Sequence, residues 1–279
     1  MKFSMGCRLG YQVEAPSSFV LNIQPATFER QQLLHERLTL TPEAPVESWV
    51  MPESGNRYLR FNARPGELTV DYEAEVELDV RRDDPATVME TPVPELPLAT
   101  LPHLYPSRYC EADRLPRAAQ ADFGHFAPGH ARVTAICNWI YEQIEYRRGT
   151  SDEHTSACDT LVDRAGVCRD FAHLGIALCR ALGIPARFVS CYAWRLDPPD
   201  FHAVFEARLG GRWYLFDPTR QAALDGLVRI GLGRDAAEVA FSTIRGAVTP
   251  TETSVRIAPT PAPAEPYTPT TLAISTADR

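Results

Sequence analysis

The sequence predicts an α+β protein in which an N-terminal antiparallel β-sandwich precedes a domain that combines a helix with an antiparallel sheet. Two observations lead to this prediction. Over residues 1–98, short apolar runs alternate with polar residues at a period of two, which is typical of strands with one buried face. Over residues 99–250, apolar residues first recur at helical spacing and then return to the strand period. Residues 251–279 are rich in Pro and Thr, so we expect a partly disordered tail there.

The first domain is expected to contain strands at 7–13, 32–41, 58–62 and 68–80. The last is the clearest, because apolar residues occupy every second position and Thr, Asp and Glu dominate the others. Clusters of Pro and Gly separate the runs. A strand with one apolar face needs a second sheet to cover it, so a sandwich is the natural arrangement.

Segment 91–106 carries five prolines and shows little periodicity, so it is either a linker or an extended segment that lies across a surface. Its apolar side chains, among them Leu96 and Leu101, need cover. We therefore expect this segment to lie along the second domain.

The second domain begins with two helices. Apolar residues at helical spacing predict one helix over residues 129–146, and a second is expected from Cys168 to about Leu182, where Gly-Ile-Pro ends it. Strands are expected at 186–194, 202–208 and 212–216, and a short helix at 235–244. Gly210-Gly211 predicts a hairpin turn between the last two strands.

Composition bounds the classes of function. The chain has 279 residues, 44% of them hydrophobic and 23% charged, which suits two modest globular domains. Its net charge of −8 gives no general basic field, so we expect neither nucleic acid nor a membrane as a partner. The stretch MKFSMGCRLGYQVEAPSSF lacks the apolar centre of a signal peptide, and the seven cysteines are scattered. We therefore expect reduced thiols in a cytoplasmic protein.

Three residues form a candidate nucleophilic site. Cys168 stands at the predicted start of a helix, His202 opens a strand, and Asp217 closes the next strand. In such a set the His takes the thiol proton, and the Asp holds the imidazole in one tautomer and stabilises its charged form. Each residue alone would be ordinary, since a lone Cys is usually a small core residue. Together, in order and each at the end of an element, they predict a catalytic triad.

The predicted positions suit this chemistry. The unpaired N–H groups and the dipole at a helix N-terminus favour a thiolate at Cys168, whose own N–H would point toward a developing oxyanion. His202 and Asp217 flank the Gly-Gly turn almost symmetrically, so they can lie across from each other on neighbouring strands.

A family resemblance is carried by four stretches, GVCRDFAHL, CRALGIPARFVS, DFHAVFEARLGGRWYLFDPTR and GLGRDAAEVAF. With them, residues 110–250 resemble the transglutaminase-like superfamily of cysteine hydrolases and acyltransferases, and the β-rich N-terminal part resembles the N-terminal domain of its bacterial branch. The resemblance implies a papain-like, transglutaminase-like catalytic domain in which the Cys-bearing helix packs on an antiparallel sheet. It implies Cys168 as nucleophile, His202 as base and Asp217 as orienter. Val204 departs from the pattern, because the family usually has Trp two residues after the His.

Four other residues stand out near the candidate site, and two of them, Trp194 and Tyr146, have two readings each. Trp194 could wall the cleft or be a half-buried core residue, and Tyr146 could support the oxyanion or simply pack. Asp170 is read as a charge that complements the first helical turn, and His173 as a packed helix residue.

The expected reaction is acyl transfer on a peptide or protein substrate through a thioester, without a cofactor. We favour water as the acceptor, which makes the protein a cysteine peptidase or amidase; an amine acceptor would make it a transglutaminase. A non-catalytic binding module on the same scaffold is an alternative that the intact triad argues against. A redox or metal protein is another, but the conceivable cluster lacks a Cys-x-x-Cys pair. Its members would be Cys158, Cys168, His173 and Cys179.

Overall fold

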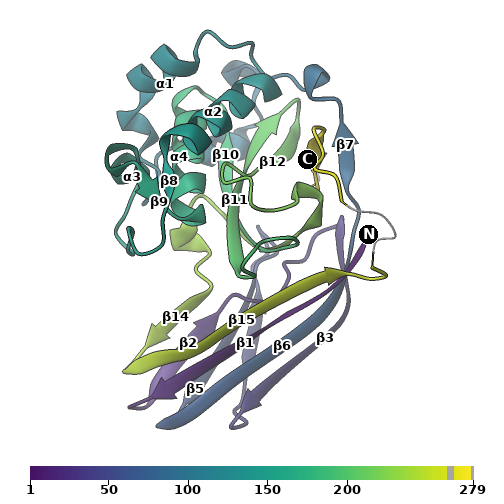
Figure 1. Cartoon of the computed structure of the whole chain (residues 1–279), viewed down its shortest axis with the longest axis vertical. Helices are drawn as coiled ribbons and strands as arrows, with labels where there is room; N and C mark the ends of the chain where they lie inside the picture. The colour runs from purple at the N-terminus through teal and green to yellow at the C-terminus, as the bar shows by residue number, and fades with distance from the viewer. Residues whose placement is uncertain (263–266, 278–279) are drawn as a thin grey trace.

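The alternating run near residues 68–80 forms β6 (Gly66–Leu78), in which every second side chain is buried. The structure is a computed structural model that describes residues 1–262 and 267–277. β6 pairs with β1 (Lys2–Val13) and β3 (Gln31–Thr41), and β15 (Val248–Pro259) pairs with the other edge of β1. These strands make one antiparallel sheet of the all-β end of the molecule (Figure 1).

A second antiparallel sheet covers the apolar face of the first. Its order is β14-β2-β5-β4. The rings of Phe19 and Phe61 stack at 5.1 Å between the two sheets, in a core that also contains Val70 and Tyr72. The sandwich predicted from the strand period is therefore confirmed. The strands are β2 (Ser17–Leu21), β4 (Glu47–Val50), β5 (Arg57–Ala63) and β14 (Ser242–Arg245).

Two strands of the sandwich come from the end of the chain, which corrects two predictions. The helix predicted at 235–244 is instead a single 3-10 turn, η6 (Ala236–Glu238), followed by β14. The tail predicted from residue 251 begins as β15, which pairs with β1 along almost its whole length. Thr and Val favour strands wherever a neighbouring edge can accept them, and composition alone does not reveal that edge. Residues 263–266 and 278–279 of the predicted tail lie outside the described residues.

The mixed end of the molecule is a sheet with helices gathered on one face (Figure 1). The sheet order is β12-β11-β10-β13, all antiparallel. The helix α4 (Cys168–Ala181) packs directly on β11, where a Cβ at Gly175 would lie 2.6 Å from the ring of Phe205. Glycine is therefore needed for this close approach. The strands are β10 (Ala186–Ala193), β11 (Phe201–Leu209), β12 (Arg212–Phe216) and β13 (Leu227–Gly233).

Three further helices surround α4. They are α1 (Pro116–Phe123), α2 (His130–Gln143) and α3 (Ala157–Asp163). The predicted hairpin turn is present, with φ of 53° at Gly210 and 83° at Gly211, a backbone that favours glycine at both positions. No helix in the described part of the chain is long and apolar enough to cross a membrane. The α+β fold class is confirmed.

Short elements complete the chain. Segment 91–106 contains η2 (Val93–Glu95) and η3 (Leu98–His103), and it lies against the mixed domain: Leu96 is buried, and Arg180 of α4 donates to the carbonyl of Tyr105 at 3.0 Å. The remaining strands pair as β7 (Arg81–Asp83) with β16 (Ala273–Ser275) and β8 (Glu145–Tyr146) with β9 (Ala165–Gly166). The remaining 3-10 turns are η1 (Pro85–Thr87), η4 (Ala112–Arg114) and η5 (Leu224–Gly226).

Side chains of the sandwich form hydrogen bonds with the backbone groups at the outer edge of β13. Asn56 exchanges two hydrogen bonds of 2.8 Å with the backbone of Leu232. The Gln31 amide does the same with the backbone of Arg229, also at 2.8 Å. Two side-chain amides thus form hydrogen bonds with the backbone at the open edge of β13, which fixes the orientation of the sandwich on the β12-β11-β10-β13 sheet.

Candidate active site

Cys168 is the first residue of α4, so its backbone N–H has no partner within the helix. The chain reaches this point through Gly166, where a Cβ would lie 2.7 Å from the Cβ of Asp170. Glycine at this position therefore admits the Asp170 side chain against the turn that presents the thiol.

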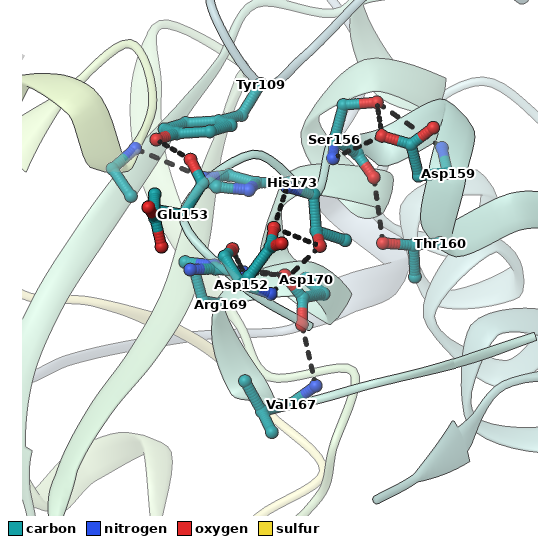
Figure 2. A network of polar contacts seen from close by, with 12 residues as sticks. Tyr109, Asp152, Glu153, Ser156, Asp159, Thr160, Val167, Arg169, Asp170 and His173 are labelled. Atoms are coloured by element: carbon teal, nitrogen blue, oxygen red, sulfur yellow. Dashed lines mark hydrogen bonds and ion pairs between the residues drawn. The ribbon is translucent and has the colours of Figure 1, made fainter. Parts of the chain in front are cut away.

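Polar contacts attach this turn to the loop before it (Figure 2). The buried Asp170 carboxylate accepts the N–H of Val167 at 2.9 Å and two bonds from Arg169 at 2.8 and 3.0 Å. Arg169 also donates to the carbonyl of Asp152 at 2.6 Å. The predicted first-turn charge is thus the residue that caps the helix carrying the thiol.

His173 lies behind this network and is a packed residue, as predicted. Its Nε2 accepts the N–H of Ala236 at 3.1 Å, and its ring stacks on Tyr109 at 5.0 Å (Figure 2). The Tyr109 hydroxyl donates to the carbonyl of Glu153 at 2.6 Å. Burial, together with the charges of neighbouring arginines, lowers the pKa of His173 to about 3, so the ring is neutral.

His202 and Asp217 meet at the open end of the β11–β12 hairpin. The register pairs Phe205 with Phe216, so Asp217, the next residue after β12, follows on opposite Val204. His202 lies two residues from Val204 on β11 and is therefore the diagonal neighbour of Asp217. His202 Nε2 lies 3.0 Å from Asp217 Oδ2, and both side chains are almost fully buried. The structure therefore brings together the two residues that the sequence placed on either side of the turn.

Asp217 is held by more than the imidazole. Its Oδ1 accepts the backbone N–H of Thr219 at 2.9 Å and the Thr219 hydroxyl at 2.7 Å, and its Oδ2 also accepts the N–H of Ala222 at 3.3 Å. Burial favours the neutral acid, but the charge of His202 and these hydrogen bonds outweigh it and lower the pKa of Asp217.

The electrostatics of His202 follow from its neighbours. Burial opposes the charged ring, but the Asp217 carboxylate and a hydrogen bond with the Cys168 thiol outweigh that effect and raise the pKa of His202 to about 10. Nε2 is used by Asp217, and Nδ1 is buried with no nitrogen or oxygen partner among the described residues. Nδ1 is therefore the ring nitrogen left to serve the thiol.

A cleft of about 610 Å³ opens over Cys168 and His202. Tyr146 lines it, and its hydroxyl accepts the N–H of Cys168 and contacts the thiol. Burial and the neighbouring thiol raise the pKa of Tyr146 to about 12, although the hydrogen bond from the Cys168 N–H opposes this shift. The ring also packs against Phe171 at 5.7 Å. Tyr146 thus lines the cleft while it packs, which agrees with the packing reading, and its support of an oxyanion stays a prediction.

The structure corrects the reading of Trp194 as a cleft wall. Its ring contacts Phe3 at 6.1 Å and Tyr267 at 5.0 Å, and it packs on the core of the sandwich. Gly226 leaves room for it, since a Cβ there would lie 2.8 Å from the Trp194 Cβ. Trp194 follows β10 at the end that meets the sandwich, so its apolar surface is covered there. Val204 is likewise buried in the core, so it forms no part of the cleft surface.

Comparisons with known proteins agree with this arrangement. A model described as the transglutaminase-like superfamily matches residues 118–218, and one described as the bacterial transglutaminase N-terminal domain matches residues 1–98. The solved structure of a candidate cysteine protease from Cytophaga hutchinsonii is 40% identical, with a TM-score of 0.92 over 99% of this chain and 97% of that chain. This chain belongs to the transglutaminase-like superfamily.

Curated relatives of this superfamily member are more distant. An uncharacterised protein from Mycobacterium leprae is 26% identical over 251 residues, which is 83% of this chain and 88% of that protein. An uncharacterised protein from Mycobacterium tuberculosis is 27% identical over 243 residues, covering 78% of this chain and 77% of that protein.

The cysteines of this transglutaminase-like protein are all free, and Cys168 is the one that is partly exposed while the other six are buried. No group of three or more His, Cys, Asp or Glu side chains is placed to hold a metal ion within residues 1–262 and 267–277. The conceivable metal cluster around Cys158 and Cys179 is therefore not assembled.

Sequence reasoning missed three residues at the site. Thr219 fixes the triad carboxylate, and the signal was available, because Asp-Pro-Thr is a sequence in which an Asp side chain bonds the backbone two residues on. Arg148 and Asp200 line the cleft and form an exposed ion pair at 3.4 Å across it. They come from loops without periodicity, so only the fold brings them together.

Proposed function

We propose that the protein catalyses thiol-dependent acyl transfer on peptide or amide substrates, with Cys168 as nucleophile, His202 as general acid and base, and Asp217 as orienter. The observation that carries this proposal is the buried His202–Asp217 contact at 3.0 Å, in which His202 lines the same cleft as a thiol at a helix start. A charged imidazole fixed beside the thiol favours the thiolate, which is the attacking form.

The steps follow from this geometry. Cys168 Sγ attacks the amide carbonyl carbon, and the electron pair of the C=O bond moves to oxygen beside the Cys168 N–H. The C–N bond then breaks, and His202 gives its proton to the leaving amine, so a thioester remains. In the second half, an acceptor loses a proton to His202 and attacks the thioester, and Cys168 is released.

Water is the acceptor that we propose, which makes the protein a cysteine peptidase or amidase. The description of the Cytophaga hutchinsonii relative as a candidate cysteine protease supports this choice. A transglutaminase would need an amine to outcompete water. For the hydroxyl of Tyr146, which lies beside the Cys168 N–H, we propose a supporting role at the oxyanion.

The test is turnover of a peptide library by wild type and single variants, with products identified by mass. Cys168→Ala and His202→Ala should each abolish turnover, because a nucleophile and its base act as a unit. Asp217→Ala should lower kcat while leaving measurable activity, because an orienter biases the tautomer and its charge. Wild-type turnover by Cys168→Ala would reject the mechanism.

Repeating the reaction with an added primary amine identifies the acceptor. Hydrolysed products alone support a peptidase or amidase, whereas products carrying the amine would replace that proposal with a transglutaminase. A non-catalytic module predicts no product from wild type under either condition, with binding of the same peptides.

A further inference from the structure

A second cavity, of about 490 Å³, lies where loops of the sandwich cover β13. Phe28, Ser54 and Asn56 line it from the sandwich, and Arg187 and Leu232 line it from the catalytic sheet. None of the residues lining it also lines the cleft around Cys168. Its volume falls in the range of sites for small molecules, roughly 300–1,000 Å³.

The wall of this cavity carries an uncompensated positive charge. Arg187 Nε donates to Glu206 Oε2 at 2.7 Å, and the other oxygen of Glu206 binds the fully buried Arg229. One carboxylate thus serves two guanidinium groups, which leaves one excess positive charge. Because the Arg187 side chain is only 15% exposed, an excess charge there is costly unless an anion approaches it.

The Arg187 guanidinium is also held in a fixed position at the cavity. Its guanidinium carbon lies 4.0 Å from the centre of the Trp213 ring, a stacking that fixes the plane of the group. Nε is used by Glu206, and the two terminal nitrogens have no acceptor among the described residues. This pair of parallel N–H donors matches a carboxylate.

The other charged groups at the cavity do not neutralise Arg187. Arg234 is paired with Glu238 at 2.6 Å, and Glu53 is an exposed loop residue. His103 is neutral, because burial and the nearby arginines lower its pKa to about 3. The remaining wall is apolar where Phe28 and Leu232 contribute.

We propose that this cavity binds a small organic monocarboxylate, with its carboxylate on the terminal nitrogens of Arg187 and its apolar body against Phe28 and Leu232. One excess charge favours a monoanion over a dianion such as phosphate. Because residues of both domains line the cavity, the ligand would bridge the sandwich and the catalytic sheet.

Calorimetric titration and thermal unfolding with three probes test the proposal. Phenylacetate carries both the carboxylate and an apolar body, phenylacetamide is its neutral counterpart, and inorganic phosphate has no apolar body. We expect phenylacetate to bind and raise the melting temperature, and the other two to bind at least about tenfold more weakly, because a bidentate charged contact is lost or mismatched. Equal binding of phenylacetate and phenylacetamide, or no binding of either, would overturn the proposal.

Four variants locate the site. Arg187→Lys keeps a charge for Glu206 but loses the paired donors, so it should weaken phenylacetate binding about tenfold or more. Ser54→Trp should block binding by filling the cavity without touching the charged groups, and Ser54→Ala is its matched control with binding intact. Arg148→Gln, in the active-site cleft, should also leave binding intact. Unchanged affinity in both Arg187→Lys and Ser54→Trp, or lost affinity in Arg148→Gln, would place the ligand elsewhere.

Discussion

At the scale of single residues, the candidate site depends on how completely Asp217 is satisfied. A buried carboxylate remains ionised only where donors surround it, and Asp217 receives bonds from both donors of Thr219, from Ala222 and from His202. The imidazole therefore faces a fixed negative charge. That charge, rather than exposure to solvent, keeps His202 protonated beside the thiol.

This arrangement predicts selective reactivity of Cys168. At pH 6, Cys168 should alkylate with iodoacetamide much faster than the other six cysteines, because it is partly exposed beside a charged imidazole whereas they are buried. Peptide mapping after brief labelling measures the relative rates. His202→Ala serves as the control and should slow labelling at Cys168 only. Equal labelling of Cys168 and a buried cysteine such as Cys179 would remove the thiolate argument.

At the scale of elements, α4 combines a buried body with a polar start. Its residues from Asp170 to Arg180 are all buried, which is unusual for a helix with a charged first turn. Hydrogen bonds from the Val167 N–H and from Arg169 offset the desolvation of the buried Asp170 carboxylate. Arg169 also donates a hydrogen bond to the carbonyl of Asp152. The nucleophile therefore sits on a rigid turn that is attached to the loop before it.

Removing that carboxylate should destabilise the protein. Asp170→Ala leaves the Val167 N–H and the Arg169 guanidinium without their partner, so the free energy of unfolding should fall by about 2–4 kcal/mol. Urea denaturation followed by circular dichroism measures it. Asp163→Ala, at the end of α3, is the control and should change little. A loss no larger than that of the control would show that the capping contact contributes nothing.

His173 on the same helix predicts a dependence of stability on acid. Its pKa is about 3 when folded and about 6.5 when unfolded, so between these values the unfolded chain binds more protons. Its contribution is therefore complete above pH 6.5 and is lost as the pH falls toward 3. His173→Gln can still accept the Ala236 N–H and should flatten the slope of unfolding free energy between pH 4 and 6.5. An unchanged slope in this variant would assign the acid sensitivity to other groups.

Local periodicity predicted most of these elements, since β12 has the predicted bounds and α4 and β10 differ from theirs by one residue. The proximity of His202 to Asp217 and to the cleft around Cys168 could be predicted for the same reason, because each of the three residues stands at the end of a periodic element. The two readings of Trp194 could not be separated, because a strand end gives no indication of which domain will cover it, and the structure agrees with the core reading. Arg148 and Asp200 were missed because loop geometry depends on contacts that a local pattern does not contain.

At the scale of the whole molecule, the chain closes on itself. It begins in β1 and returns to pair β15 with that strand, while β14 adds an edge beside β2 (Figure 1). The mixed domain of helices and sheet is therefore inserted between strands of one sandwich. Pairings between residues about 250 positions apart leave no local signal, so the predicted domain of residues 1–98 leaves out two strands of the sandwich.

This closure predicts that residues 1–98 do not fold stably alone. Without β14 and β15, the fragment exposes one edge of β1 and one of β2, and it loses the buried Val255 from its core. The same fragment with residues 242–259 joined through a flexible linker restores both edges and should unfold cooperatively on heating, as followed by circular dichroism. A linked version in which Val255 is replaced by Asp is the matched control and should not recover, because it buries a charge. Cooperative unfolding of residues 1–98 alone, at the same temperature as the linked version, would show that the returning strands are not needed.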